Sequence, residues 1–165
     1  ASGAAPGDEV EVEEDALFAA FGLTRSPLSE KGAQVLHKAA EIGSELCDGV
    51  GREVGEEAAK AAADYYHQGK LANNVEEFEA ASTWFEESQR VQPRTATLLS
   101  IANMRLKLGD GALAAYICSF ILSHPLSTSN DLDMAGRKLR NAQAQLEVEL
   151  QPSPLVGGAG GPGRG

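Results

Sequence analysis

The sequence predicts an all-α protein with an internal repeat. Apolar residues recur at three- and four-residue spacing over residues 28–150, and no segment shows the sustained alternation of a half-buried strand. Glycine and proline interrupt this pattern at intervals and divide it into short helices. Two of the divided segments resemble one another. Apolar residues make up 42% of the 165 residues, which is enough for a core of ordinary size.

The composition predicts three parts: an acidic extended arm over residues 1–27, a helical domain over 28–150 and a flexible tail rich in glycine and proline over 151–165. The arm and the tail are expected to reach across neighbouring proteins and to gain order on binding.

The acidic arm ends in a short apolar segment that is a candidate docking element. Six acids lie between Asp8 and Asp15, and Leu17, Phe18 and Phe21 follow at once. In one interpretation the acids speed the encounter with a partner protein and these apolar residues anchor it. In the other, the aromatic residues fold back onto the chain's own core.

The helices expected in the middle part are, in order, residues 29–47, about 53–69, 76–91, 94–108, 112–123 and 131–148. Ser29 can cap the first, and Asn130 or Asp131 can cap the last. A polar loop is expected at residues 70–75. The glycines at 49, 51 and 55 predict a helix interruption rather than a phosphate-binding loop, because no strand precedes them.

The internal repeat aligns residues 80–93 with residues 112–125, so that Trp84 matches Tyr116 and Pro93 matches Pro125. Upstream of each segment, a small residue is followed by a larger one and then by glycine: Ala62, Tyr65 and Gly69 match Ala102, Arg105 and Gly109. This pattern resembles the tetratricopeptide repeat, a pair of antiparallel helices in about 34 residues.

The resemblance covers residues 56–126 and implies about two antiparallel helix pairs, with helices 29–47 and 131–148 as flanking caps. It implies close helix approach at Ala62, Ala81 and Ala102, with Tyr65, Trp84 and Phe85 filling the space between helix pairs. The stretch from Gly69 to Ala81 is longer than the pattern and is expected to carry an insertion in the turn. An irregular helical bundle is the alternative.

The resemblance also implies a concave groove lined by the first helix of each pair. On the matching positions, that face carries the candidate partner-binding residues Tyr66, His67, Leu99, Asn103 and Lys107. Some family members grip a C-terminal carboxylate there, but Leu99 and Ala59 stand where lysine is expected. The groove is therefore expected to be mainly apolar and suited to a partner helix or an extended peptide.

Charge excludes some classes of partner. Fourteen Lys and Arg against 24 Asp and Glu leave a net charge of −10, which opposes general attraction to nucleic acids or anionic membranes. The longest apolar stretch, residues 112–122, is about half as long as a membrane-spanning helix. We therefore expect no membrane insertion, although peripheral attachment to a membrane complex is compatible with the sequence.

No catalytic or metal-binding pattern is found in the sequence. The three histidines are scattered singly, and hydrolase, metalloprotease and phosphate-loop motifs are absent. Cys47 and Cys118 are expected to be small buried residues, and the sequence leaves open whether they form a disulfide. We expect no enzymatic activity, no cofactor and no metal.

The sequence thus favours a non-catalytic scaffold for other protein subunits, as a peripheral accessory subunit of a larger complex. The alternative is a free chaperone or assembly factor that holds a client transiently. The first residues, Ala-Ser-Gly-Ala-Ala-Pro-Gly, are typical of a processed end and favour an organelle such as the chloroplast. Simple removal of the initial methionine from a cytoplasmic protein is the alternative.

Overall fold

The computed structural model describes residues 15–23 and 29–150. The predicted tail, most of the acidic arm and the segment 24–28 lie outside the described residues. Every regular element of the described part is a helix, as the apolar periodicity predicts. After helical residues 15–20 come α2 (Glu30–Cys47), α3 (Glu56–Asn74), α4 (Phe78–Val91), α5 (Thr95–Lys107), α6 (Gly111–Ser123) and α7 (Ser129–Leu150).

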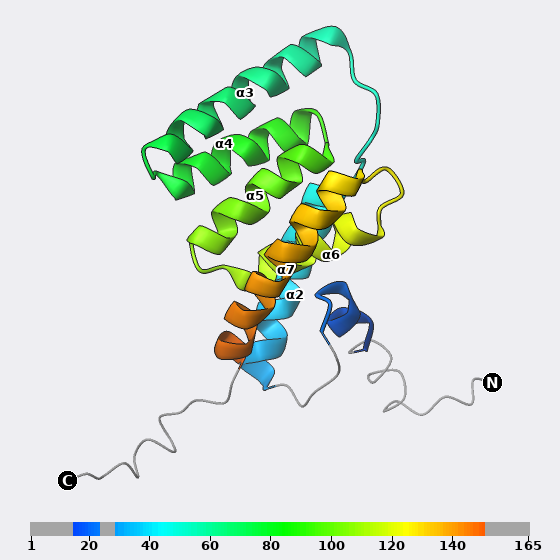
Figure 1. The fold of residues 1–165 in the computed structure, drawn as a ribbon, viewed down its shortest axis with the longest axis vertical. Helices are drawn as coiled ribbons and strands as arrows, with labels where there is room; N and C mark the ends of the chain where they lie inside the picture. Colours follow the sequence, from blue (N-terminus) through cyan, green and yellow to red (C-terminus); the bar gives the residue numbers. More distant parts are fainter. Residues whose placement is uncertain (1–14, 24–28, 151–165) are drawn as a thin grey trace.

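The helices from α3 to α7 stack in chain order, each against the next (Figure 1). Short turns join α3 to α4 and α5 to α6, so each of these is an antiparallel pair. The helix α7 packs against both α5 and α6. This arrangement of packed pairs is compatible with the predicted helical repeat.

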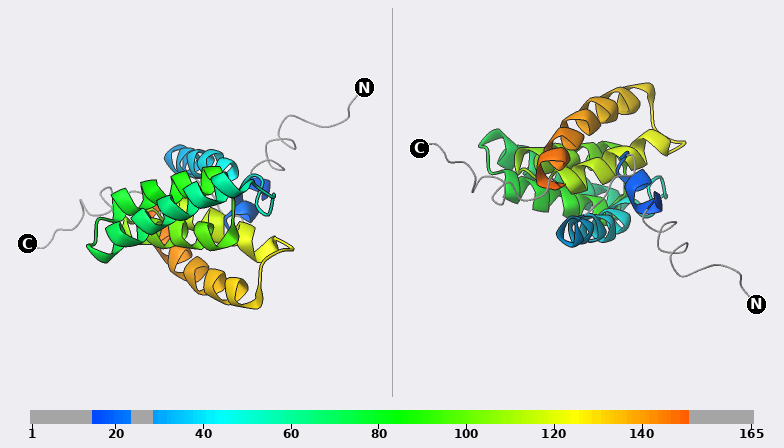
Figure 2. Two further views of the ribbon diagram at one scale, coloured as in Figure 1. Left: turned by 90° about the horizontal axis from the view of Figure 1, so that it is seen from above. Right: turned by 90° about the horizontal axis from the view of Figure 1, so that it is seen from below.

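The helix α2 occupies a different place from the predicted one. It packs mainly against α6 and has few contacts with α4, so it does not cap the α3–α4 pair. In Figure 2, α2 and α7 lie on opposite sides of the molecule with α6 between them. This enclosure explains why Ala114, Ile117, Cys118 and Ile121 of α6 have no exposed surface. The core is therefore centred on α6.

Small residues allow the close helix packing that the repeat pattern implies. Ala62, Ala81 and Ala102 are all buried. A Cβ atom added at Gly69 would lie 2.6 Å from the Phe85 ring, so this glycine lets α3 approach α4. Trp84 differs from the prediction: it is 37% exposed and stacks on Tyr65, with ring centroids 5.9 Å apart, instead of filling a gap between helix pairs.

The predicted loop at residues 70–75 is wrong, because α3 continues to Asn74. Lys70, Leu71 and Ala72 favour helix, and Ala72 is buried, so the extra length adds to the helix. The turn follows at Val75 to Glu77, where Glu76 has a positive φ of 61°. The insertion therefore lengthens the first helix of the pair.

Side-chain hydrogen bonds cap the first turns of α2, α6 and α7, and in α6 the Leu113 amide donates to Asp110 Oδ1 at 3.2 Å. The Ser29 hydroxyl accepts a hydrogen bond from the Gly32 amide at 3.0 Å, as predicted for the start of α2. The cap of α7 is Thr128 rather than Asn130 or Asp131. The Asp131 amide donates to Thr128 Oγ1 at 3.1 Å, and the Thr128 amide donates to Asp131 Oδ2 at 2.8 Å. This reciprocal pair is a capping box.

The apolar end of the predicted arm belongs to the core. Phe18 and Phe21 are 3% and 0% exposed, and Leu17 packs against the same cluster. Phe21 meets Tyr116 edge to face, with ring centroids 5.5 Å apart. Gln143 Nε2 of α7 donates to the Gly22 carbonyl at 2.7 Å. Of the two interpretations of these aromatic residues, the structure therefore shows the one in which they fold back.

Cys47 and Cys118 are free and buried, and burial raises the pKa of each thiol to about 12.

Over the described residues, no helix is both long and apolar enough to cross a membrane.

Candidate binding groove

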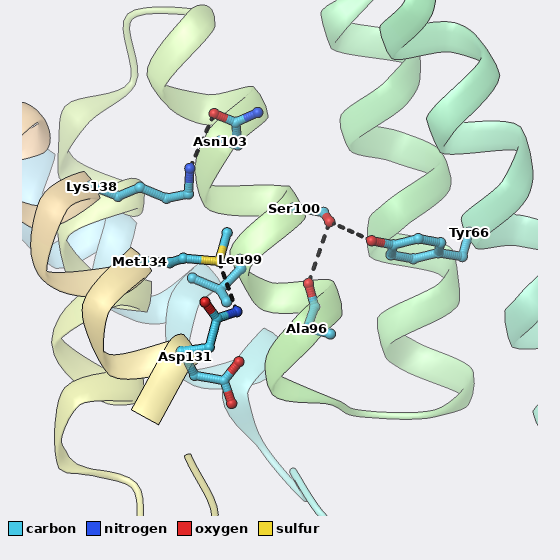
Figure 3. A pocket seen from close by; sticks show the side chains of 9 residues that line it. Tyr66, Ala96, Leu99, Ser100, Asn103, Asp131, Met134 and Lys138 are labelled. Atoms are coloured by element: carbon cyan, nitrogen blue, oxygen red, sulfur yellow. Dashed lines mark hydrogen bonds between the residues drawn. The ribbon is translucent and has the colours of Figure 1, made fainter. Parts of the chain in front are cut away.

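A groove of about 250 Å³ lies between α3, α5 and α7 (Figure 3). Its floor is one face of α5, formed by Ala96, Leu99, Ser100 and Asn103 at three- and four-residue spacing. Tyr66 of α3 forms one wall, and α7 forms the other with Asn130, Asp131, Met134 and Lys138. Residues from three helices that are distant in sequence thus meet in one concave surface.

A hydrogen-bonded chain fixes the wall contributed by α3. The Tyr66 hydroxyl lies 2.9 Å from Ser100 Oγ, and Ser100 Oγ donates to the Ala96 carbonyl at 3.3 Å. Either hydroxyl can donate in the contact between Tyr66 and Ser100. The Tyr66 ring also packs against Phe85, with centroids 5.0 Å apart. The wall is therefore held from both sides before any partner binds.

Lys138 is the main charged group of the opposite wall. Its side chain points across the groove, and its Nζ donates to Asn103 Oδ1 at 3.4 Å (Figure 3). Burial lowers the pKa of Lys138; the nearby Cys118 opposes this shift, and the positive charges of Arg137 and Lys107 add to it. The ammonium group is thus partly desolvated and held by a neutral amide.

The cations around the groove have neutral partners. Lys107 Nζ donates to Asn73 Oδ1 at 3.2 Å and lies 4.7 Å from the centroid of the Phe78 ring. The guanidinium of Arg94 lies 5.9 Å from the centroid of the Tyr66 ring. In the described part of the chain, no carboxylate forms an ion pair with Lys107, Lys138 or Arg94.

Other cations of the molecule do have acidic partners. Ion pairs join Arg90 to Glu87 at 2.7 Å and Arg105 to Glu86 at 2.8 Å. The acid within the groove, Asp131, accepts the Thr128 amide as part of the α7 cap. The groove lining therefore carries one cation, Lys138, whose partner is neutral, and one anion, Asp131, which is engaged in the α7 cap.

The structure brings together part of the predicted partner-binding set. Tyr66, Leu99 and Asn103 all line the groove. Lys107 lies at the end of α5, bonded to Asn73, and His67 is exposed on α3 outside the lining. Leu17, Phe18 and Phe21 are packed in or against the core and present no exposed anchor.

The expectation of a mainly apolar groove is wrong, because α7 adds polar groups that the repeat pattern did not include. The resemblance ends at residue 126, so the groove that it implies does not include Asp131, Met134 and Lys138. The spacing of these three positions places them on one face of the last helix. That spacing was the available signal, but the face could be assigned to the groove only once α7 was placed against α5.

A second hollow, of about 360 Å³, lies where the ends of α2 and α6 meet, and it includes Cys47 and His124. The raised pKa of Cys47 keeps its thiol protonated near neutral pH. His124 Nδ1 accepts the Leu126 amide at 3.2 Å, and its ring packs against Phe120. These groups serve packing and loop structure.

Among the described residues, no group of three or more His, Cys, Asp or Glu side chains is placed so that it could hold a metal ion.

Comparisons with protein-family models, with curated proteins and with solved structures found no match to this chain.

Proposed function

We propose that this chain is a non-catalytic scaffold, a peripheral accessory subunit whose groove holds a segment of another protein in a larger assembly. The observation that carries the proposal is Lys138, a partly desolvated cation in a preformed groove whose hydrogen-bond partner is the neutral Asn103. A partner segment that presents a carboxylate to this ammonium would fit the groove best.

The energetics favour such a segment. Desolvation disfavours the charged form of Lys138, and a carboxylate placed beside the ammonium would favour it again. Charge-assisted hydrogen bonds contribute about 1.5–3 kcal/mol each, more than bonds between neutral groups. The floor residues Ala96 and Leu99 offer apolar contact beneath the same segment. The groove thus combines one charged anchor with a surface for side-chain packing.

The arrangement of the groove supports a tetratricopeptide-like architecture as part of the proposal. Its residues come from the first helix of each packed pair and from α7, which follows in the same direction. In repeat proteins of this kind, such a concave surface is used for binding. The fixed Tyr66 wall lowers the conformational entropy lost on association.

Site-specific photo-crosslinking tests the proposal. A benzophenone amino acid replaces Ala96 in the groove, and a control carries it at Gln34, an exposed position of α2. We expect the Ala96 probe to give one defined crosslinked segment that contains an acidic side chain or a C-terminus. Lys138→Met should remove this crosslink, whereas Lys31→Met on α2 should leave it intact. Equal crosslinking from Gln34, or indifference to Lys138→Met, would contradict the proposal.

Native mass separates the accessory subunit from the alternative, a free chaperone. A stable subunit should comigrate at fixed stoichiometry with a large complex when source material is gently solubilised. A species near 17.3 kDa that still crosslinks through Ala96 would instead favour transient client binding through the same groove.

A further inference from the structure

The outer face of the α3–α4 pair is a second surface that lacks a covering helix. The helix α3 packs against α4. The helix α4 also packs against α5 and makes a few contacts with α2. Figure 1 shows α3 at one end of the stack, with no labelled helix beyond it. This face does not take part in the binding groove, because Tyr66 leaves α3 on the side that faces α5 (Figure 3).

An aromatic pair, the half-buried Tyr65 and the exposed Trp84, lies on this face. Tyr65 and Trp84 stack with ring centroids 5.9 Å apart and an interplanar angle of 25°, and Trp84 is 37% exposed. Ala61 and Ala80 each lie four residues before one of these aromatics, on the same side of their helices. Stacked rings flanked by small residues form a flat apolar surface, which is typical of the centre of an interface.

The matching position of the second helix pair is covered. Tyr116 of α6, the counterpart of Trp84 in the repeat, packs against α2 at Gly43, where an added Cβ would collide with its ring. The chain itself therefore shows that an amphipathic helix with a small residue can cover an aromatic at this position. Nothing in the described part of the chain covers Trp84 in the same way.

The negative charge of the α3–α4 pair indicates which kind of partner would bind to the outer face. Residues 56–91 contain eight acids and three bases, so these 36 residues carry a net charge of −5, half of the total of −10. Asp64 precedes Tyr65, and Glu87 follows Trp84 by one helical turn. Of the eight acids, only Glu86 and Glu87 form ion pairs among the described residues. A second copy of this chain would bring like charges together, which disfavours pairing of two such faces.

We propose that the outer face of α3 and α4 docks a basic amphipathic helix of a partner protein. The apolar side of that helix would pack on Tyr65 and Trp84, and its lysine or arginine residues would meet Asp64, Glu57 and the other unpaired acids. The chain would then bridge two partners of opposite local charge, one in the groove and one on this face.

The single tryptophan of the chain provides a direct readout, because Trp84 lies in the proposed surface. The probe is a synthetic amphipathic helix of leucine and lysine without aromatic residues, and its counterpart has glutamate in place of lysine. We expect the lysine peptide to shift the Trp84 emission to shorter wavelength in a saturable manner. The affinity should fall as ionic strength rises, and the glutamate peptide should give no shift.

Two alanine-to-arginine variants localise the binding. Ala80→Arg places a bulky cation beside Trp84, whereas Ala144→Arg places the same side chain at an exposed position of α7. Both sites are exposed and helical, so both variants should fold. We expect Ala80→Arg to weaken binding by about tenfold or more, which corresponds to about 1.4 kcal/mol. Ala144→Arg should leave the affinity within about twofold.

Three outcomes of the peptide experiments would overturn the proposal. They are the absence of a saturable shift, an equal effect of the two arginine variants, and salt-insensitive binding of both peptides. A concentration-dependent dimer that buries Trp84 would also overturn it, because a second copy would then be the occupant. Lys138→Met changes the groove alone and should leave peptide binding unchanged, so failure here is distinguishable from failure of the proposed groove function.

Discussion

Single residues decide how closely the helices approach one another. Gly69 lies in the middle of α3, where glycine is unfavourable for helix formation, yet its missing side chain makes room for the Phe85 ring. Gly136 is also helical, in α7, but an added Cβ there would meet nothing within 4 Å. The two glycines therefore provide a matched pair in which the helix propensity is similar and the packing differs.

Alanine at these two positions should have opposite effects. Gly69→Ala places a Cβ against Phe85 and is expected to lower the free energy of unfolding by about 1–3 kcal/mol. Gly136→Ala should raise it by about 0.5–1 kcal/mol, because only the propensity changes. Urea unfolding followed by circular dichroism measures both. Stabilisation by Gly69→Ala would show that Phe85 can move away at little cost.

The two buried thiols predict how stability depends on alkaline pH. The pKa of Cys47 and of Cys118 rises from 9.0 to about 12 in the folded chain. Between these values, the unfolded chain has lost thiol protons that the folded chain retains, so the free energy of unfolding falls as the pH rises from about 9 to about 12. Replacing both cysteines by alanine should make this decline shallower, as measured by unfolding across that range.

The same shift predicts slow thiol chemistry in the folded protein. A pKa of about 12 in place of 9.0 reduces the thiolate fraction near neutral pH by about a thousandfold. Alkylation by iodoacetamide should therefore be at least that much slower in the folded chain than in the unfolded chain. Rapid alkylation of either cysteine under native conditions would contradict the burial on which the shift depends.

Among the elements, α7 connects stability to the binding groove. It carries one wall of the groove through Asp131, Met134 and Lys138, and its first turn is fixed by the Thr128–Asp131 capping box. The helix α2 is capped in a similar way by Ser29 but contributes nothing to that lining. Comparing a variant that lacks the α7 cap with one that lacks the α2 cap therefore distinguishes a general loss of stability from a local effect on the groove.

Removal of the two caps should affect stability similarly and the groove differently. Thr128→Ala and Ser29→Ala should each lower the free energy of unfolding by about 1 kcal/mol. Thr128→Ala should also reduce crosslinking from the Ala96 probe, because fraying of the first turn loosens the groove wall that α7 forms. Ser29→Ala should not. Equal crosslinking in the two variants would indicate that the groove does not depend on the first turn of α7.

On the scale of the whole molecule, Gln89 joins parts of the chain that are distant in sequence. This residue of α4 is 1% exposed, and its Nε2 donates to the Leu46 carbonyl at the end of α2 at 2.8 Å. Its Oε1 accepts the Arg94 amide at the start of α5 at 3.0 Å. One buried amide thus satisfies backbone groups of two other segments, and this links α2 to the stack of helix pairs.

Gln89→Ala should destabilise the whole chain in one transition. The substitution leaves the Leu46 carbonyl and the Arg94 amide without this partner, and we expect a loss of about 2–4 kcal/mol. Gln68→Ala, at an exposed position of α3, should change stability by less than about 0.5 kcal/mol. In each variant, Trp84 fluorescence and circular dichroism should give coincident unfolding curves. Separate transitions would show that α2 unfolds independently of the α3–α4 pair.

Local patterns in the sequence predict the helices and part of the groove. Apolar periodicity and glycine or proline breaks depend on local geometry, so they predict every helix from α2 to α7. The resemblance to the tetratricopeptide repeat places Tyr66, Leu99 and Asn103 on one surface. The length of α3 was missed, because Ala72 gains burial only from its neighbours in the folded chain.

The tertiary structure alone decided which faces are covered. Only the fold shows that α2 packs on α6 instead of on α3, that Phe18 and Phe21 enter the core, and that Lys138 reaches Asn103 from α7. The physical reason is that burial and desolvation arise from contacts between residues far apart in the chain. Periodicity identifies the face of a helix that will be buried, but the element that covers it depends on the packing of the whole molecule.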